Sequence, residues 1–280
     1  MSTMKFIKAF FLLFLIGGLI SCEDVIDLQL PDGDTLLVVD AWFTDQKGIN
    51  GVRLSQSAPY FSNEETPAVT GAGVELLDGT GNIIPWTEDP NEPGFYTTDT
   101  VGTIGYEYAL HITTADGKEY LSQRERMNFV PPILKIYDKF REKSILFQEG
   151  WYVLIDTYEP TGFGAYYRWK YYVNGAYQVS REQIAVAEDL LVDGNDIIGL
   201  DINFEPMEDG DSVRVEQMSI TEEAYTYLSK LQLSLFTGGP FDAPPAPVKG
   251  NIISLDDPNE KVLGYFTVSA ISAAEKVIGQ

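Results

Sequence analysis

Short runs of alternating apolar and polar residues recur along most of the chain and predict β-strands. In the clearest run, 106–113, Tyr106, Tyr108, Leu110 and Ile112 alternate with Glu107, Ala109, His111 and Thr113. A period of two places one set of side chains on a buried face. Asp116-Gly117 then predicts a hairpin turn onto a strand at 119–123.

The same pattern extends over the first half of the chain. Further β-rich runs, each followed by turn residues, lie at 36–43, 51–56, 73–77 and 95–98. About seven short strands with a turn every eight to twelve residues are typical of an immunoglobulin-like β-sandwich. We therefore predict a mainly β fold with a sandwich domain at 35–128.

A second β-rich domain is expected at 131–280. Pro131-Pro132 fits neither a helix nor a central strand and therefore predicts a boundary. Asn174-Gly175 is the strongest hairpin signal in the chain. The strands predicted in this part lie at 151–157, 166–173, 177–180, 197–204, 212–219 and 264–271.

One amphipathic helix, at about 220–236, is expected within the second domain. Ser219-Ile220-Thr221-Glu222 has the S-x-x-E form of a capping box. Apolar residues then recur at spacings of four, three and four, at Ala224, Leu228, Leu231 and Leu235. Gly238-Gly239-Pro240 predicts the end of the helix.

The N-terminus has the organisation of a cleaved signal peptide, predicted at 1–21. Lys5 and Lys8 precede an apolar run, 9–20, that is too short to cross a bilayer. The following Ser21-Cys22 completes a sequence that resembles a lipobox, which implies cleavage between these two residues and lipidation of Cys22. Two or three acyl chains would anchor the body to a membrane through an acidic tether at 22–34. The alternative is a buried free cysteine after an ordinary signal peptide.

Charge narrows the classes of partner. The formal charge is −23, and loss of Lys5 and Lys8 with the signal makes it −25. Nucleic-acid binding needs a basic stripe, which this sequence lacks, so no nucleic-acid partner is expected. Because anionic lipid would repel such a body, the lipid has to provide the anchor. Glu23 and Asp24 resemble the acidic surface-export signals of Bacteroidetes-type lipoproteins, which implies an outer-membrane protein facing the cell exterior.

The candidate chemistry argues against an enzyme. His111 is the only histidine and Cys22 the only cysteine, so histidine-based triads and multi-histidine or thiolate metal sites are excluded or rest on one position. No nucleophile elbow, phosphate loop or zinc-protease motif occurs. We expect no cofactor and no metal. The Asp-Gly clusters 193–196 and 208–211 read as turns, with calcium as the alternative. Asp40 is expected to be buried and paired with Arg53.

Aromatic residues crowd two predicted strands and provide the best candidate for an interaction surface. Rings at alternate strand positions are usually core. In 166–172 both odd and even positions carry aromatic rings, so either both faces of the strand are covered or one set of rings is exposed. The candidate surface comprises Trp151, Tyr166, Tyr167, Trp169, Tyr171 and Tyr172.

Several segments resemble the domain-of-unknown-function 4249 family of Bacteroidetes-type lipoproteins. They are the run from Cys22 to Asp27, Leu37-Val38-Val39-Asp40-Ala41-Trp42, Val52-Arg53-Leu54-Ser55, Pro67-Ala68-Val69-Thr70-Gly71-Ala72, Pro240-Phe241-Asp242-Ala243-Pro244-Pro245, Gly250-Asn251-Ile252 and Val262-Leu263-Gly264-Tyr265-Phe266. These motifs specify turns and strands more than a chemistry, and the family has no established activity, so no catalytic residue carries over. The resemblance implies a partner, because such lipoproteins are commonly encoded beside TonB-dependent receptors.

Two hypotheses on function follow. The first is a non-enzymatic surface lipoprotein of unknown ligand that serves as a capture or accessory subunit of a TonB-dependent nutrient transporter. The alternative is a glycan-binding or glycan-hydrolysing surface protein that uses carboxylates and aromatic rings. Two carboxyl groups about 5 Å or 6.5–9.5 Å apart in a deep tryptophan-lined cleft would favour hydrolysis. A third hypothesis, an adhesive or structural surface protein, is not separated from the first by sequence.

Overall fold

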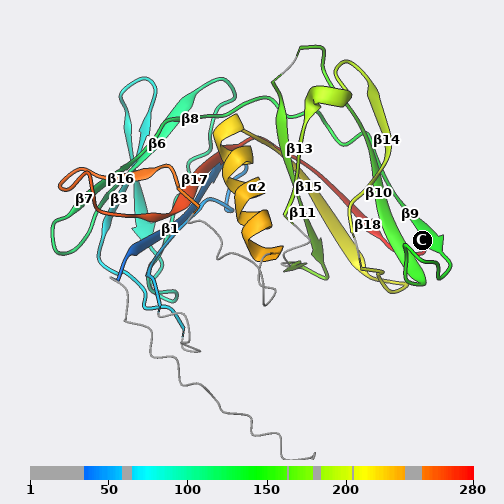
Figure 1. Cartoon of the computed structure of the whole chain (residues 1–280), viewed down its shortest axis with the longest axis horizontal. Coiled ribbons are helices and arrows are strands. Elements are labelled where there is room, and N and C mark those ends of the chain that lie inside the picture. The colour runs from blue at the N-terminus through cyan, green and yellow to red at the C-terminus, as the bar shows by residue number, and fades with distance from the viewer. Residues whose placement is uncertain (1–34, 59–64, 163, 179–183, 204, 237–247) are drawn as a thin grey trace, which may run out of the picture. The chain divides into compact units, whose positions relative to one another are not determined.

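The computed structural model describes residues 35–58, 65–162, 164–178, 184–203, 205–236 and 248–280 (Figure 1). The predictions on Ser21, Cys22 and the tether at 22–34 lie outside the described residues. Thr35–Gln280 form one compact unit. No helix in the described part is long and apolar enough to cross a membrane.

The predicted mainly β fold is confirmed. The strands are β1 (Leu37–Thr44), β2 (Gly51–Gln56), β3 (Gly73–Asp78), β4 (Ile83–Glu88), β5 (Phe95–Thr97), β6 (Glu107–Thr113), β7 (Glu119–Ser122), β8 (Glu125–Arg126), β9 (Lys135–Arg141), β10 (Gly150–Tyr158), β11 (Tyr166–Val173), β12 (Ala176–Tyr177), β13 (Ala185–Glu188), β14 (Asp196–Asp201), β15 (Ser212–Ile220), β16 (Ile252–Ser254), β17 (Leu263–Ser269) and β18 (Ile271–Val277). The helical elements are α2 (Glu222–Phe236) and the 3-10 turn η2 (Asp189–Leu191).

The largest sheet combines strands from both ends of the described chain. Its order is β16-β7-β6-β3-β4-β5-β2-β1-β17, with β8 paired to β6. Strand β17 runs parallel to β1, and β16 runs antiparallel to β7. The first and the last strand of this order, β16 and β17, therefore both come from the segment beyond α2. The boundary predicted at Pro131-Pro132 and the immunoglobulin-like subtype stay predictions.

One side chain links the two ends of this strand order. The Asn251 Nδ2 donates to the carbonyl of Phe266 at 2.9 Å, and its Oδ1 accepts from the Phe266 amide at 2.9 Å. Asn251 directly precedes β16, whereas Phe266 lies in the middle of β17. In the described part of the chain, the Asn251 side chain therefore links β16 and β17, which do not pair through backbone hydrogen bonds.

Two glycines make this approach possible. A Cβ built on Gly250 would lie 1.8 Å from the Gly264 carbonyl oxygen, and one on Gly264 would lie 1.9 Å from that of Val39. Gly264 also has a φ of +94°, which side-chain-bearing residues rarely adopt. Only glycine lets β17 lie this close to β1 and to the start of β16.

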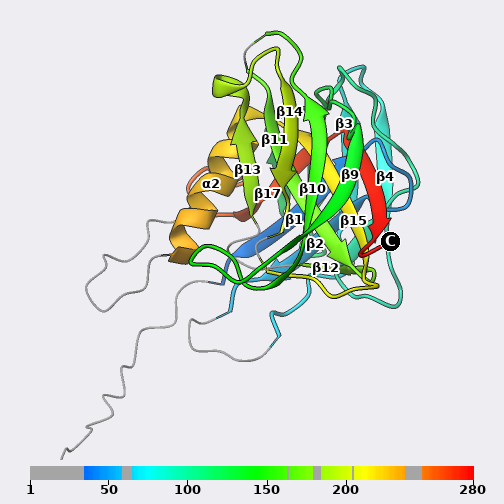
Figure 2. The ribbon, with the colours of Figure 1, turned by 90° about the vertical axis from the view of Figure 1, so that its right-hand side faces the viewer.

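Two smaller sheets complete the unit. One has the order β14-β10-β9, and the other β12-β11-β15-β18 with β13 also paired to β11. Figure 2 shows β10 between β14 and β9. The predicted Asn174-Gly175 hairpin is present between β11 and β12, with φ values of +51° and +81°.

The helix α2 begins two residues later than predicted. Ser219 is the last residue but one of β15, and its hydroxyl donates to the Asn128 carbonyl at 2.7 Å. Thr221 caps the helix instead, because its Oγ1 accepts from the Ala224 amide at 3.2 Å. The helix then packs Ala224 and Leu228 against Ile220 and Tyr265, beside β13 and β17 (Figure 1).

Candidate functional site

A polar cleft of about 350 Å³ lies beside the hairpin that joins β6 to β7. Four further segments contribute to its walls: the start of β1, the end of β2, the residues 68–70, and the loop between β16 and β17. Its ionisable residues are Asp116, Lys118, Tyr120 and Glu260, and its uncharged polar residues are Thr35, Gln56, Thr70 and Thr114.

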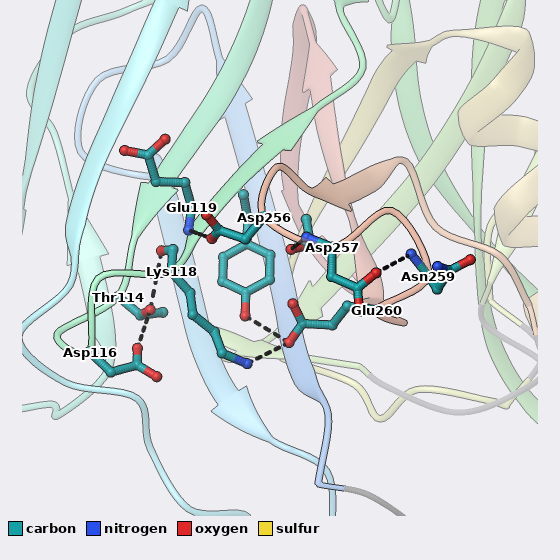
Figure 3. Close-up of polar contacts among 10 residues, drawn as sticks. Thr114, Asp116, Lys118, Glu119, Asp256, Asp257, Asn259 and Glu260 are labelled. Atoms are coloured by element: carbon teal, nitrogen blue, oxygen red, sulfur yellow. Dashed lines mark hydrogen bonds and ion pairs between the residues drawn. The ribbon is translucent and has the colours of Figure 1, made fainter.

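The hairpin turn places Lys118 and Asp116 at this cleft. The Thr114 amide donates to the Lys118 carbonyl at 2.9 Å, and the Gly117 amide donates to the Thr114 carbonyl at 2.8 Å. Gly117 adopts a φ of +88°, which the predicted Asp-Gly turn requires. The Thr114 hydroxyl donates to Asp116 Oδ1 at 2.5 Å, so the side chains close the turn as well (Figure 3).

The loop after β16 brings Glu260 to the same place. The Glu119 amide donates to Asp256 Oδ2 at 2.8 Å, which ties this loop to β7 (Figure 3). Within the loop, the Glu260 amide donates to the Asp257 carbonyl at 3.0 Å, and the Asn259 amide donates to Asp257 Oδ1 at 2.9 Å. Short turns thus fix the Glu260 side chain against the hairpin.

A single carboxylate oxygen joins the two segments. Glu260 Oε1 accepts from Lys118 Nζ at 2.8 Å and from the Tyr120 hydroxyl at 3.2 Å. The Lys118 contact lowers the pKa of Glu260 and raises that of Lys118. Burial, reinforced by the Glu260 charge, raises the pKa of Tyr120 to about 12. The hydrogen bond from Thr114 lowers the pKa of Asp116.

These shifts define what the cleft can do chemically. Both carboxylates stay ionised at neutral pH, while the tyrosine and the lysine both keep their protons. General acid–base catalysis works best with a group whose pKa lies near the operating pH. The pKa values of all four groups are shifted away from neutral pH. The cleft therefore offers fixed charges, donors and acceptors to a polar ligand.

The structure resolves which predicted aromatic residues face inward. Tyr167, Trp169 and Tyr171 are buried in the core, each at most 9% exposed. Tyr166 and Tyr172 lie half-buried on the opposite face of β11 and pack against other rings, Tyr225 at 5.1 Å and Tyr177 at 5.3 Å between centroids. None of these residues lines the polar cleft. That these residues form an interaction surface stays a prediction. Of the six, Trp151, Tyr166 and Tyr172 are half-buried and are therefore the ones a partner could contact.

Asp40 and Arg53 occupy register positions opposite each other on β1 and β2, as predicted for neighbouring strands. The expected pairing was nevertheless wrong. Arg53 donates to Glu92 at 2.5 Å, and Asp40 is exposed on the strand, so its carboxylate is solvated and needs no partner.

The other residues considered for chemistry have ordinary structural contacts. His111 Nδ1 lies 3.5 Å from Glu75 Oε2 on the neighbouring strand, away from the cleft lining. The Asn195 amide donates to the Val192 carbonyl at 3.0 Å, and the Asp211 amide donates to the Glu208 carbonyl at 3.3 Å, so both Asp-Gly clusters are turns. Within the described ranges, no group of three or more acidic, histidine or cysteine side chains is arranged to hold a metal ion.

Four carboxylates that sequence reasoning did not place in the interior are buried in the described part of the chain: Glu125, Glu159, Asp189 and Glu216. Glu125 is the most deeply buried, at 2% exposed. Its Oε1 accepts from the Tyr265 hydroxyl at 2.6 Å and from Asn251 Nδ2 at 3.1 Å, and its Oε2 accepts from the Thr221 hydroxyl. Burial raises the pKa of Glu125 against these hydrogen bonds. Because both oxygens are occupied, Glu125 connects β8, β17 and the start of α2 as a structural residue.

Comparison with known proteins places these motifs in a family. No curated protein matches the chain. The family described as "Domain of unknown function (DUF4249)" matches residues 23–275. This confirms the resemblance seen in the turn and strand motifs, and the chain belongs to the DUF4249 family.

Proposed function

We propose that this protein is a surface-exposed outer-membrane lipoprotein, anchored through Cys22, that acts without catalysis as a capture or accessory subunit of a TonB-dependent nutrient transporter. The signal sequence, the lipobox-like Ser21-Cys22 and the acidic Glu23-Asp24 support the anchor and its outward orientation. Membership of the DUF4249 family supports the transporter partner through the resemblance described above.

The pKa values in the polar cleft carry the non-catalytic part of the proposal. Glu260 and Asp116 have lowered pKa values, whereas the pKa values of Lys118 and Tyr120 are raised. A site whose protonation states are fixed across neutral pH suits recognition better than proton transfer. We propose that this cleft contacts either the captured ligand or the transporter.

A glycan-binding or glycan-hydrolysing protein is the second candidate. The row of hydroxyl, amide and carboxylate groups along the cleft favours it, since sugars present many donors and acceptors. A sugar ring could not stack on an aromatic side chain here, because Tyr120 is the one aromatic residue among the lining residues and is only 3% exposed. Hydrogen bonding alone would therefore have to hold the sugar in this cleft.

A pull-down separates the two candidates. The tagged full-length protein would be recovered from outer membranes in mild detergent, and copurifying proteins identified by mass spectrometry. We expect a β-barrel receptor in roughly equal amount, and less of it with Lys118→Glu, which reverses the charge beside Glu260. Lys139→Glu, an exposed lysine on β9, is the matched control. Recovery of the lipoprotein alone would contradict the transporter role, and glycan hydrolysis by the same preparation would favour the second candidate.

A further inference from the structure

Two cations share the face of β11 that carries Tyr166 and Tyr172. Residues of even number on this strand, including Arg168 and Lys170, point away from the core that Tyr167, Trp169 and Tyr171 occupy. Both are half-buried. In a protein of formal charge −23, with 42 acidic residues against 19 basic ones, we would expect such cations to be neutralised by a neighbouring carboxylate.

The nearest carboxylate on the adjacent strand is already occupied. Glu216 is the register partner of Lys170, but its Oε1 accepts from Arg214 Nε at 3.0 Å and its Oε2 accepts from the Tyr172 hydroxyl at 3.2 Å. No carboxylate among the described residues forms an ion pair with Arg168 or Lys170. The buried Nε of Arg168 also has no hydrogen-bond acceptor in the described part of the chain.

Aromatic residues, and not carboxylates, contact both cations: Lys170 lies over aromatic rings, and Arg168 contacts a tyrosine hydroxyl. Lys170 Nζ lies 5.4 Å from the ring centroid of Tyr177 and 5.9 Å from that of Trp42. Among the described residues, the Arg168 guanidinium donates a single long hydrogen bond, to the Tyr177 hydroxyl at 3.4 Å. Tyr177 therefore touches both cations, and Trp42 from β1 forms the far wall beside Lys170.

The ammonium group keeps its charge here. Burial, together with the neighbouring Arg168, lowers the pKa of Lys170 to about 8, against the favourable fields of Glu216 and Asp40. At pH 7 a group with that pKa is about nine-tenths protonated. Two positive groups lie on one strand face beside two aromatic rings, and within the described ranges they have N–H donors without an acceptor. This arrangement matches an oxyanion carried on a small ligand.

We propose that Arg168, Lys170, Trp42 and Tyr177 form a binding site for an oxyanion, a carboxylate, sulfate or phosphate group. The guanidinium and the ammonium bind the oxygens, and the rings of Tyr177 and Trp42 contact whatever the group is attached to. This inference goes beyond the proposed function, since the site is separate from the polar cleft and needs no transporter partner.

Isothermal titration of the full-length lipidated protein in neutral detergent tests the site. The probes are sodium sulfate, sodium phosphate and galacturonate, with quenching of tryptophan fluorescence as a second readout near Trp42. For ions this small we expect a Kd on the order of 1 mM. Tighter binding of galacturonate than of the inorganic ions would identify an acidic sugar; tighter binding of the inorganic ions would identify a sulfate or phosphate group.

Matched variants decide whether Arg168 and Lys170 carry the binding. Lys170→Gln and Arg168→Gln remove one positive charge each, and we expect at least about tenfold weaker binding in both. Lys170→Arg should retain binding, and Lys139→Gln, which removes an exposed charge on β9, should leave the Kd unchanged. The inference is overturned if none of the three probes binds the wild-type protein. It is equally overturned if Lys170→Gln and Arg168→Gln, both folded by circular dichroism, bind as the wild type does.

Discussion

At the scale of single residues, contacts between distant positions decide the chemistry. Glu260 meets Tyr120 across 140 residues, and Glu125 meets Tyr265 across the same separation. Alternation along a strand predicted Tyr106, Tyr108, Leu110 and Ile112 as the inward-facing set, because that pattern is local. The last three are buried, whereas Tyr106, which precedes β6, is 45% exposed. Alternation gives no information about which acidic residue packs against the first residues of a helix, so the burial of Glu125 was not predicted.

The buried Glu125 predicts a specific pH dependence of stability. Its pKa is raised in the fold, so its contribution to stability is complete below the ordinary glutamate pKa and is lost as pH rises through the raised value. Glu125→Gln stays neutral and removes this loss. Between pH 4 and pH 8 the wild type should therefore lose more stability than Glu125→Gln does, by about 1.4 kcal/mol for each unit of raised pKa.

Urea unfolding at several pH values measures this difference. The control is Glu107→Gln, since Glu107 is an exposed carboxylate on the adjacent strand β6. Its pH profile should follow that of the wild type, because general charge repulsion changes equally in both variants. Parallel profiles for Glu125→Gln and the wild type would show that Glu125 does not titrate in this way.

At the scale of elements, the helix and the hairpins were the most predictable parts, because their signals lie within a few residues. The helix end at Phe236 agrees with the prediction, and its start is displaced because Ser219 is recruited into β15. Strand β18 was missed, since Ile271–Val277 is rich in alanine and charged residues that rarely mark strands. Pairing with β15 stabilises that segment as a strand regardless of its composition.

The displaced helix start makes Thr221 the residue to test. Its hydroxyl caps α2 through the Ala224 amide and also donates to Glu125. Thr221→Ala should destabilise the protein by about 2 kcal/mol, because both the cap and one partner of a buried carboxylate are lost. Thr221→Ser keeps the hydroxyl and should remain within about 0.5 kcal/mol of the wild type. Equal losses for the two variants in urea unfolding would exclude the cap as the cause.

At the scale of the whole molecule, the order of strands in the sheets could not be predicted from the sequence and is known only from the structure. The parallel pairing of β17 with β1 and the attachment of β16 to β7 bring a segment from beyond α2 into the first sheet. Turn residues and alternation describe single strands and hairpins and carry no signal for which distant strands pair. The family motifs around Gly250-Asn251 and Gly264 lie at this junction, which explains why they specify a fold more than a chemistry.

The contact between β16 and β17 predicts that the side-chain amide of Asn251 contributes strongly to stability. Asn251 is 3% exposed and serves both backbone groups of Phe266 as well as Glu125. Asn251→Ala leaves these buried groups without partners and should cost about 3 kcal/mol in the free energy of unfolding. Asn259→Ala, in the exposed loop after β16, should change it by less than about 0.5 kcal/mol. A loss below about 1 kcal/mol for Asn251→Ala would mean that the ladders alone hold the two ends of the strand path.

The proposed anchor is tested on the whole chain. The acidic body would be repelled by anionic lipid, so membrane association should depend on acyl chains attached to Cys22. In Cys22→Ala, the protein should leave the membrane fraction and appear in the soluble fraction after cell lysis. Ser21→Ala keeps the cysteine and a small residue before it and should remain in the membrane. If Cys22→Ala stayed in the membrane fraction with its signal cleaved, another part of the protein would have to bind the membrane, and the lipid anchor would be wrong.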